Sequence, residues 1–171
     1  MADPATEAIE LLVLDVDGVL TDGLIHIDAH GVETKTYHTR DGFALRAWLK
    51  LGYDVAIITG RSGMSLQHRA DELGIRHVHQ SVTDKRRAFG DLLRSLGIVA
   101  SHAAVIGDDL PDLPMMRLSG YPIAVADAAP EVRAVAEYVT AAPGGRGAVR
   151  DAVEHLLREH NRWEDVTAMY R

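Results

Sequence analysis

The chain contains no cysteine, which excludes disulfide frameworks, thiolate metal sites and cysteine nucleophiles and fits a cytoplasmic protein. Aromatic residues make up only 5% of it, and acidic residues outnumber basic ones by 25 to 18, for a net charge of −7. This composition argues against a general nucleic-acid binder. No apolar run approaches the roughly 20 residues of a membrane span, and residues 1–7 lack the basic start of a signal or transit peptide. We therefore expect neither nucleic acid nor a membrane as a partner.

The composition is that of an ordinary folded domain. Hydrophobic residues make up 47% of the 171 residues, which excludes a disordered chain. Compact domains run about 100–200 residues, so we expect a single domain over residues 1–171. An acidic protein can accept an anionic substrate only where a cation or local basic residues offset its overall field.

Short apolar runs alternate with amphipathic segments along the chain. Runs that predict buried strands occur at residues 11–14, 55–58 and 103–106, with shorter candidates at 76–79, 122–125 and 138–140. Helices are predicted over residues 41–51, 62–74 and 83–96, with N-caps at Asp41, Ser62 and Thr83, and a last helix over 147–159. The alternation predicts an α/β fold: a three-layer, doubly wound parallel sheet of the Rossmann type.

Two segments depart from this alternation. Residues 24–27 and 34–38 flank a turn at 28–31 that contains glycine, which predicts a β-hairpin inserted at about residues 24–38. The tail of about residues 161–171 shows no periodicity, yet it carries Trp163, Met169 and Tyr170. A tail with such anchors often docks on a surface.

Polar residues follow the three strongest strand candidates. Asp15 and Asp17 come directly after the first, Thr59 after the second, and Asp108 and Asp109 after the third. Each alone has an ordinary explanation as a turn residue, a backbone partner or a helix start. In a parallel sheet, however, the carboxyl ends of the strands meet at one edge, where ligands bind.

Lys85 strengthens this reading, because a cation in the first turn of a helix opposes the helix dipole unless an anion is held nearby. Oxygen ligands without His or Cys suit Mg²⁺. Mg²⁺ and Lys85 together would neutralise a dianionic phosphate and the charge of its transition state. The alternating pair His77 and His79 lacks a third ligand at suitable spacing, so we predict no histidine metal site.

The segments at these strand ends resemble a known set of motifs. They are Asp15-Val16-Asp17-Gly18-Val19-Leu20-Thr21-Asp22-Gly23, then Ile57-Ile58-Thr59-Gly60-Arg61, then Lys85, and then Gly107-Asp108-Asp109. The set resembles the four motifs of the haloacid dehalogenase-like phosphatases, over nearly the whole chain. Residues 39–42, 107–112, 125–128 and 144–150 are similar to the capless 3-deoxy-D-manno-octulosonate 8-phosphate (Kdo-8-phosphate) phosphatases of that superfamily.

The resemblance implies roles for the strand-end residues. Asp15 would be the nucleophile that forms an aspartyl-phosphate. Asp17 would protonate the leaving alcohol and then activate water. Thr59 and Lys85 would bind the transferred phosphoryl group. The expected activity is Mg²⁺-dependent hydrolysis of a sugar-acid phosphate.

The resemblance also implies the residues that surround this chemistry. The metal ligands it implies are Asp15, Asp108 and, within the Asp17 turn, the Val16 carbonyl rather than the Asp17 side chain. The supporting residues are Asp109 and Asp112. The candidates for binding the sugar acid are Arg40, Gly60, Arg61, Gly145 and Arg146. The backbone amides of residues 144–147 and the Arg146 side chain are expected to hold an anion at a helix start.

Only the short hairpin is inserted between the motifs, so no cap domain is present. In capless relatives neighbouring subunits cover the site, which implies a homotetramer whose hairpin and aromatic tail make the contacts. A phosphatase of a nine-carbon keto acid 9-phosphate (KDN or N-acylneuraminate) remains an alternative, although Arg61 after Thr59-Gly60 resembles the octulosonate group more, because the nonulosonate relatives tend to carry an acidic residue there. A phospho-receiver is another, but Asp17 supplies an acid/base that a receiver lacks. A non-catalytic regulatory subunit is the third.

Overall fold

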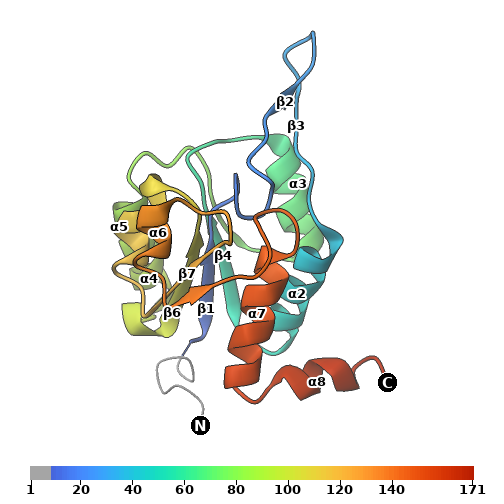
Figure 1. Cartoon of the computed structure of the whole chain (residues 1–171), viewed down its shortest axis with the longest axis vertical. Coiled ribbons are helices and arrows are strands. Elements are labelled where there is room, and N and C mark those ends of the chain that lie inside the picture. Colours follow the sequence, from blue (N-terminus) through green and yellow to red (C-terminus); the bar gives the residue numbers. More distant parts are fainter. Residues whose placement is uncertain (1–8) are drawn as a thin grey trace.

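A six-stranded parallel sheet forms the centre of the computed structural model, which describes residues 9–171 (Figure 1). The expectations for residues 1–7 lie outside the described residues. The strands run in the order β5-β4-β1-β6-β7-β8 and all pair in parallel. Their bounds are β1 Leu11–Leu14, β4 Asp54–Ile58, β5 His77–His79, β6 Ala103–Gly107, β7 Tyr121–Ala124 and β8 Tyr138–Val139.

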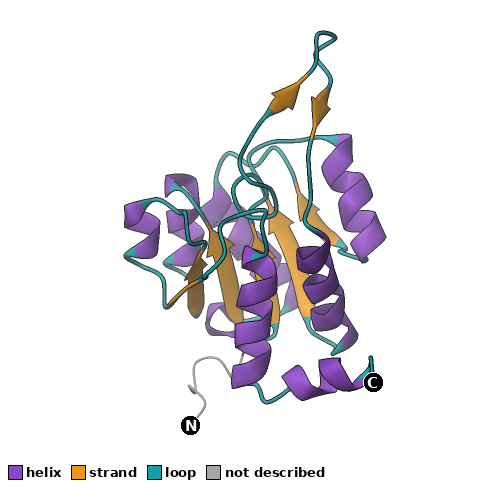
Figure 2. Ribbon diagram, turned by 45° about the vertical axis from the view of Figure 1, so that its right-hand side comes forward, coloured by secondary structure: helices purple, strands orange, loops and turns teal. Residues whose placement is uncertain are grey.

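Helices cover both faces of the sheet (Figure 2), so the predicted three-layer α/β fold is confirmed. The helix bounds are α2 Thr39–Lys50, α3 Met64–Leu73, α4 Lys85–Leu96, α5 Leu113–Met116, α6 Pro130–Arg133, α7 Ala148–Glu159 and α8 Trp163–Ala168, with 3₁₀ turns at Ala100–His102 and Leu110–Asp112. Helix α2 packs against α7 and α3, whereas α4 packs against α5. Strands β1 and β6 lie between these layers and are buried along their whole length, which explains their unbroken apolar sequence.

The observed strands agree with the predicted ones to within a residue or two, whereas three of the helices begin at other residues than predicted. Helix α2 begins at Thr39, before its predicted cap Asp41, and α3 begins at Met64 after Gly63 rather than after Ser62. The cap of α4 is Asp84, whose carboxylate accepts a hydrogen bond from the Arg87 N–H, and not Thr83. Helix ends depend on which of several neighbouring polar residues reaches a free amide, and composition alone does not decide this.

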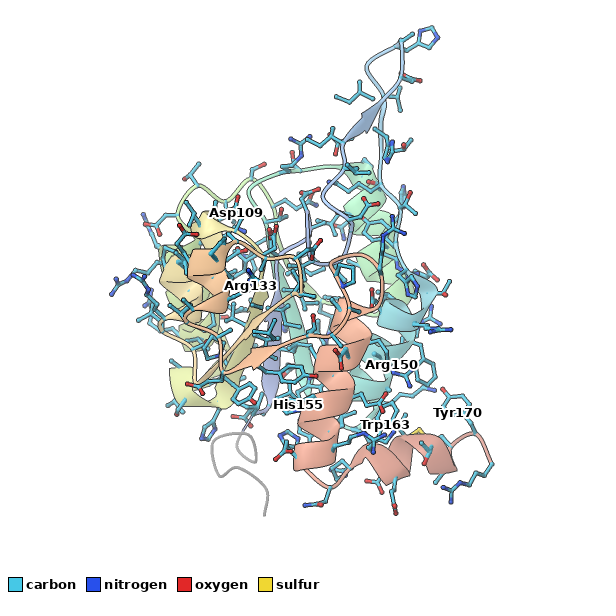
Figure 3. The ribbon with its side chains drawn as sticks, in the orientation of Figure 1. Asp109, Arg133, Arg150, His155, Trp163 and Tyr170 are labelled. Carbon is cyan, nitrogen blue, oxygen red and sulfur yellow. The ribbon has the colours of Figure 1, made fainter. Side chains whose placement is uncertain are left out.

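The tail contains a further helix, so the helix at 147–159 is not the last. Helix α8 begins at Trp163, which is buried, and the Arg150 guanidinium lies 4.8 Å from the centre of the Trp163 ring (Figure 3). The Tyr170 ring lies 5.3 Å from that of Phe43 on α2. The tail thus docks on α2 and α7 of its own chain. Its six-residue helix is too short to show an amphipathic period.

The predicted hairpin is present and projects beyond the carboxyl edge of the sheet (Figure 1). Its strands β2 (His26–Ile27) and β3 (Glu33–Thr34) are shorter than predicted and pair antiparallel. The Asp28 carboxylate closes the turn by accepting hydrogen bonds from the His30 and Val32 N–H groups, both at 2.8 Å. Residues 35–38 are not strand but form the return to α2. Among residues 9–171, no helix has the length and apolar character needed to cross a membrane.

Candidate active site

The carboxyl ends of β1, β4 and β6 meet at one edge of the sheet. Leu14 pairs with Ile57 on one side and Ile106 on the other, so the residues that follow these strands converge. They enclose a hollow of about 230 Å³. Its lining consists of Asp15, Asp17, Thr59, Gly60, Arg61, Lys85, Asp108, Asp109, Pro111 and Asp112. The structure therefore brings the predicted strand-end residues together.

Lys85 is the cation of this hollow. Its Nζ lies 2.9 Å from Asp15 Oδ1 and 2.7 Å from Asp112 Oδ1, and all three residues are buried. Burial would lower the pKa of Lys85, but the two neighbouring carboxylates outweigh it and the pKa is raised. Lys85 therefore stays charged, held by two acids, in the first turn of α4 where a cation alone would be unfavourable.

The carboxylates of the hollow are crowded. Asp15, Asp108 and Asp112 each offer an oxygen within 4.8 Å of the others. Burial, followed by the negative charge of Asp112, raises the pKa of Asp15 to about 6, and burial with the Asp112 and Asp15 charges raises the pKa of Asp108 to about 8. One lysine does not balance three acids, so this all-oxygen donor set fits a hard divalent cation such as Mg²⁺.

Asp112 and Asp109 hold the loop after β6 in place. Asp112 accepts hydrogen bonds from Lys85 and, at 3.1 Å, from the Asp108 N–H. The exposed Asp109 (Figure 3) caps the 3₁₀ turn by accepting the Leu110 N–H at 2.8 Å. Asp112 thus orients Lys85 and the backbone of Asp108, which leaves Asp15 and Asp108 as the acids best placed to bind a cation.

The Val16 carbonyl does not suit the ligand role predicted for it. It accepts hydrogen bonds from the N–H groups of Val19, Leu20 and Thr21, at 3.2, 2.9 and 3.0 Å. These bonds close the turn that follows β1 and use up the lone pairs of the oxygen. Among the described residues no hydrogen bond reaches the Asp17 carbonyl, so the backbone oxygen available for a cation in this turn is that of Asp17.

Thr59 is fixed from both sides. Its backbone N–H donates to the His79 carbonyl at 2.9 Å, and its buried hydroxyl accepts the Arg61 N–H at 3.3 Å. The hydroxyl hydrogen remains available as a donor, because the contact with Arg61 uses an oxygen lone pair. Thr59 can therefore offer a hydrogen bond to an anion in the hollow while it also satisfies local backbone.

The segment 144–147 does not form the amide cradle that the sequence suggests, and that prediction is wrong. The Gly144 N–H donates to Asp127 at 2.9 Å, the Gly145 N–H to the Val19 carbonyl at 2.9 Å, and the Gly147 N–H to Asp41 at 3.3 Å. These amides are already satisfied inside the fold and cannot also hold an anion.

The glycines of this segment serve close packing instead. A Cβ at Gly144 would lie 1.7 Å from the Gly18 carbonyl oxygen, and one at Gly145 would lie 2.3 Å from the Asp22 nitrogen. The segment therefore lies directly against the turn that presents Asp17. Only glycine permits backbones to approach this closely.

Arg146 and Arg40 lie outside the hollow. The exposed Arg146 guanidinium is 3.5 Å from the Asp22 carboxylate and, with Gly145, lines a neighbouring hollow of about 270 Å³ at the foot of the hairpin. Arg40 is exposed in the first turn of α2 and lines neither hollow. Of the candidates for binding the sugar acid, Gly60 and Arg61 line the hollow itself.

Asp41 does not cap the helix at residues 41–51, although its position in the sequence predicts this role. Its buried carboxylate accepts hydrogen bonds from the Arg150 N–H at 2.8 Å and the Gly147 N–H at 3.3 Å. It therefore caps α7, more than 100 residues further along the chain, rather than its own helix. Burial raises the pKa of Asp41 against these hydrogen bonds. The contact ties the start of α2 to the segment that supports the turn after β1.

Lys35 and Glu33 lie beside the site, although neither is among the candidate residues predicted from the sequence. The Lys35 ammonium forms an ion pair with the Asp17 carboxylate and lies 3.2 Å from Glu33, and Glu33 in turn lies 2.5 Å from the Arg61 guanidinium. Glu33 and Lys35 both follow the hairpin turn, in a segment where alternating charges are usually exposed to solvent. Nothing in the local sequence indicates that the chain carries them back to the sheet edge.

An aspartate pair after the first strand, with threonine, lysine and aspartate at the neighbouring strand and helix ends of a doubly wound parallel sheet, is the arrangement of the haloacid dehalogenase-like hydrolases. Residues 76–151 match the family model described as haloacid dehalogenase-like hydrolase. The 3-deoxy-D-manno-octulosonate 8-phosphate phosphatase KdsC of Escherichia coli K12 is 45% identical over 94% of this chain and 85% of that protein.

Solved structures of related phosphatases have the same fold as this chain. The phosphatase of Moraxella catarrhalis, crystallised with magnesium, phosphate and KDO, superposes with a TM-score of 0.95 at 42% identity over 98% of this chain and 96% of that one. The cobalt-bound enzyme of Haemophilus influenzae gives 0.90 at 36% identity, over 93% of each chain. The chain therefore belongs to the 3-deoxy-D-manno-octulosonate 8-phosphate phosphatase family.

Proposed function

We propose that this protein is a Mg²⁺-dependent phosphatase that hydrolyses Kdo-8-phosphate to Kdo and inorganic phosphate, a step in lipopolysaccharide precursor synthesis. The observation that carries the proposal is the buried Asp15 carboxylate, which lies in the hollow 2.9 Å from the Lys85 ammonium and shares the hollow with Asp17. A nucleophile, a cation for the transferred group and an acid/base are thus brought together in a chain of this family.

In the first step, an Asp15 carboxylate oxygen attacks the phosphorus of the substrate. The new phosphorus–oxygen bond to Asp15 forms as the bond to the sugar oxygen breaks, and Asp17 gives its proton to that departing oxygen. Lys85 and the Thr59 hydroxyl bind the phosphoryl oxygens as charge moves onto them. The products of this step are Kdo and an aspartyl-phosphate.

In the second step, the Asp17 carboxylate removes a proton from water. The water oxygen attacks phosphorus, the bond to Asp15 breaks, and inorganic phosphate leaves with Asp15 restored. Asp15, Asp108 and the Asp17 backbone carbonyl would hold Mg²⁺, which supplies charge neutralisation that lets the carboxylate approach a phosphate dianion. Asp112 would act indirectly by holding Lys85, and Asp109 by holding its own loop.

The sugar acid would extend from the phosphate site toward the mouth of the hollow. Arg61 lines this hollow and Arg146 the neighbouring one, so these cations are the proposed partners of the substrate carboxylate. Gly60 would leave room beside Arg61. The position of Arg40 lends its predicted substrate role less support.

We further propose that the protein acts in the cytoplasm as a homotetramer in which neighbouring subunits cover each active site. The support is the exposed apolar side of the hairpin, where Leu24 and Ile27 are 60% and 62% exposed. Exposed apolar residues in such a cluster mark an interaction surface. The tail contributes less than the sequence suggests, because Trp163 is already buried against its own chain.

A phosphate-release panel tests the function. The purified protein with Mg²⁺ is offered Kdo-8-phosphate, KDN 9-phosphate, N-acetylneuraminate 9-phosphate and simple sugar phosphates, and kcat/KM is compared. We expect the highest value for Kdo-8-phosphate. A higher value for a nine-carbon acid phosphate would make that compound the substrate in place of Kdo-8-phosphate. This outcome is a real alternative because a difference of one carbon in length changes binding energy only a little. A stable phospho-aspartate without phosphate release would indicate a receiver, and no phosphorylation or release at all would indicate a regulatory subunit.

A further inference from the structure

The foot of the hairpin reaches into the active site through Lys35. This residue follows β3 directly, and its ammonium pairs with Asp17 Oδ1. Its side chain is only 5% exposed, and the Asp17 side chain is 20% exposed. Among the described residues, Asp17 has no second hydrogen bond or ion pair for its side chain. The orientation of this carboxyl group therefore depends on Lys35.

Lys35 is itself held by a row of alternating charges. Glu33 Oε1 lies 3.2 Å from Lys35 Nζ, and Glu33 Oε2 lies 2.5 Å from the Arg61 guanidinium. Hydrogen bonds from Arg61 and Lys35 lower the pKa of Glu33, which keeps it ionised between the two cations. The row joins the loop after β4, the hairpin and the turn after β1.

An ordinary surface ion pair does not account for this contact. Exposed pairs contribute little, because they are solvated and cost side-chain entropy. The Lys35 side chain is instead almost completely removed from water. Its partner, Asp17, is the carboxyl group that exchanges protons in the proposed function. The contact engages Oδ1 and leaves Oδ2 to carry the proton.

We propose that Lys35 is a positioning residue that holds the Asp17 carboxyl group in line with the leaving-group oxygen, and that the hairpin thereby sets the efficiency of proton transfer. The inference rests on the acid/base role of Asp17 in the proposed function. An ammonium can donate to Oδ1 whether or not Oδ2 is protonated, so the same contact serves both steps. A hairpin ordered by subunit contacts would then order the acid as well.

The leaving group provides a test that a merely structural role would not pass. Phenyl phosphate needs its leaving oxygen protonated, whereas 4-nitrophenyl phosphate, with a far better leaving group, needs little help. Neither ester carries a sugar or a carboxylate. We expect Lys35→Met to lower kcat/KM about tenfold for phenyl phosphate and about twofold or less for 4-nitrophenyl phosphate. Lys35→Arg, which keeps a donor, should restore most of the loss.

Lys50→Met serves as the matched control, because Lys50 is an exposed lysine at the far end of α2. Circular dichroism and light scattering would be recorded for each variant, so that the comparison is between folded proteins of equal assembly. An equal loss on both esters, or no loss on either, would overturn the inference. So would a loss confined to Kdo-8-phosphate, which would make Lys35 a substrate contact.

The wild-type protein separates this test from that of the proposed function. A wild type that hydrolyses both aryl esters but not Kdo-8-phosphate would refute the proposed substrate and leave the Lys35 comparison intact. A wild type inactive on every ester would overturn both. An active wild type whose Lys35→Met variant shows an unchanged leaving-group dependence would overturn the positioning role alone.

Discussion

The carboxylate cluster at the ends of β1 and β6 and the projecting hairpin lie side by side but are stabilised in opposite ways. In the cluster, Asp15 and Asp112 are buried, and both pair with the buried Lys85 within one subunit. The hairpin has two paired positions and exposes its large apolar side chains. A single chain thus brings the active-site residues together, whereas the hairpin surface is the one that we propose contacts neighbouring subunits, and Lys35 joins the two regions.

The largest effect should come from the cluster. Asp15→Asn removes the nucleophile, so we expect phosphate release to fall at least about a thousandfold. Because burial and the Asp112 charge raise the pKa of Asp15 to about 6, the ionised carboxylate costs stability above that pH. The neutral amide should therefore leave the metal-free Tm at pH 7 unchanged or higher. Phosphate release that persists in the purified variant would refute the assignment of Asp15.

Mg²⁺ should stabilise the cluster and not the hairpin. A ligand that binds only the folded state at about 100 times its Kd adds about 2.7 kcal/mol to the free energy of unfolding. We expect such a gain, measured by denaturant titration with Mg²⁺ and with EDTA, for the wild type and for the hairpin variant Asp28→Asn. Asp108→Asn should lose most of it. A gain of equal size in Asp108→Asn would place the metal elsewhere.

Glycine substitutions compare the two regions through packing. At Gly144 a Cβ would meet the Gly18 carbonyl at 1.7 Å, so Gly144→Ala should cost about 1–3 kcal/mol and displace the turn that carries Asp17. At Gly31, in the hairpin, a Cβ meets open space and only the positive φ of 79° opposes it. Gly31→Ala should cost about 1 kcal/mol and leave the kcat of the chemical step unchanged. Unaltered activity in Gly144→Ala would show that the turn tolerates displacement.

Arg146→Ala should affect substrate binding near the foot of the hairpin. Loss of one charged hydrogen bond to the substrate carboxylate, worth about 1.4 kcal/mol, would lower kcat/KM for Kdo-8-phosphate about tenfold. The value for 4-nitrophenyl phosphate, which has no such carboxylate, should change little. Equal losses on both substrates would indicate that Arg146 supports the loop through Asp22 instead.

The same contrast explains what the sequence could reveal. The strand-end residues Asp15, Thr59 and Asp108 were predictable, because apolar runs locate the strands and parallel strands bring their carboxyl ends to one edge. The direction in which a side chain points after a turn could not be predicted. Asp41 reaches a helix more than 100 residues away, and Lys35 folds back onto Asp17.

The roles of backbone groups also could not be predicted from the sequence motifs. Glycines at 144 and 145 suggest an anion cradle as readily as a close packing contact, since both need glycine. The hydrogen bonds made by their amides decide between the two, and those depend on Asp127 and Val19 in distant parts of the chain. The Val16 carbonyl is a similar case, because its turn, and not its spacing from Asp15, determines where it points.

The smallest effect on the subunit should come from the hairpin surface. Ile27→Ser replaces a side chain that is 62% exposed among residues 9–171, so the free energy of unfolding of the isolated subunit should change by about 0.5 kcal/mol or less. If the proposed tetramer forms through the hairpins, the assembly should nonetheless weaken, because the substitution removes an apolar side chain from that surface. Light scattering at assay concentration would show a smaller species, and phosphate release would fall with it as the sites lose their neighbours. A wild-type monomer with full activity at the same concentration would refute the tetramer, and the hairpin would then serve its own subunit through Lys35 alone.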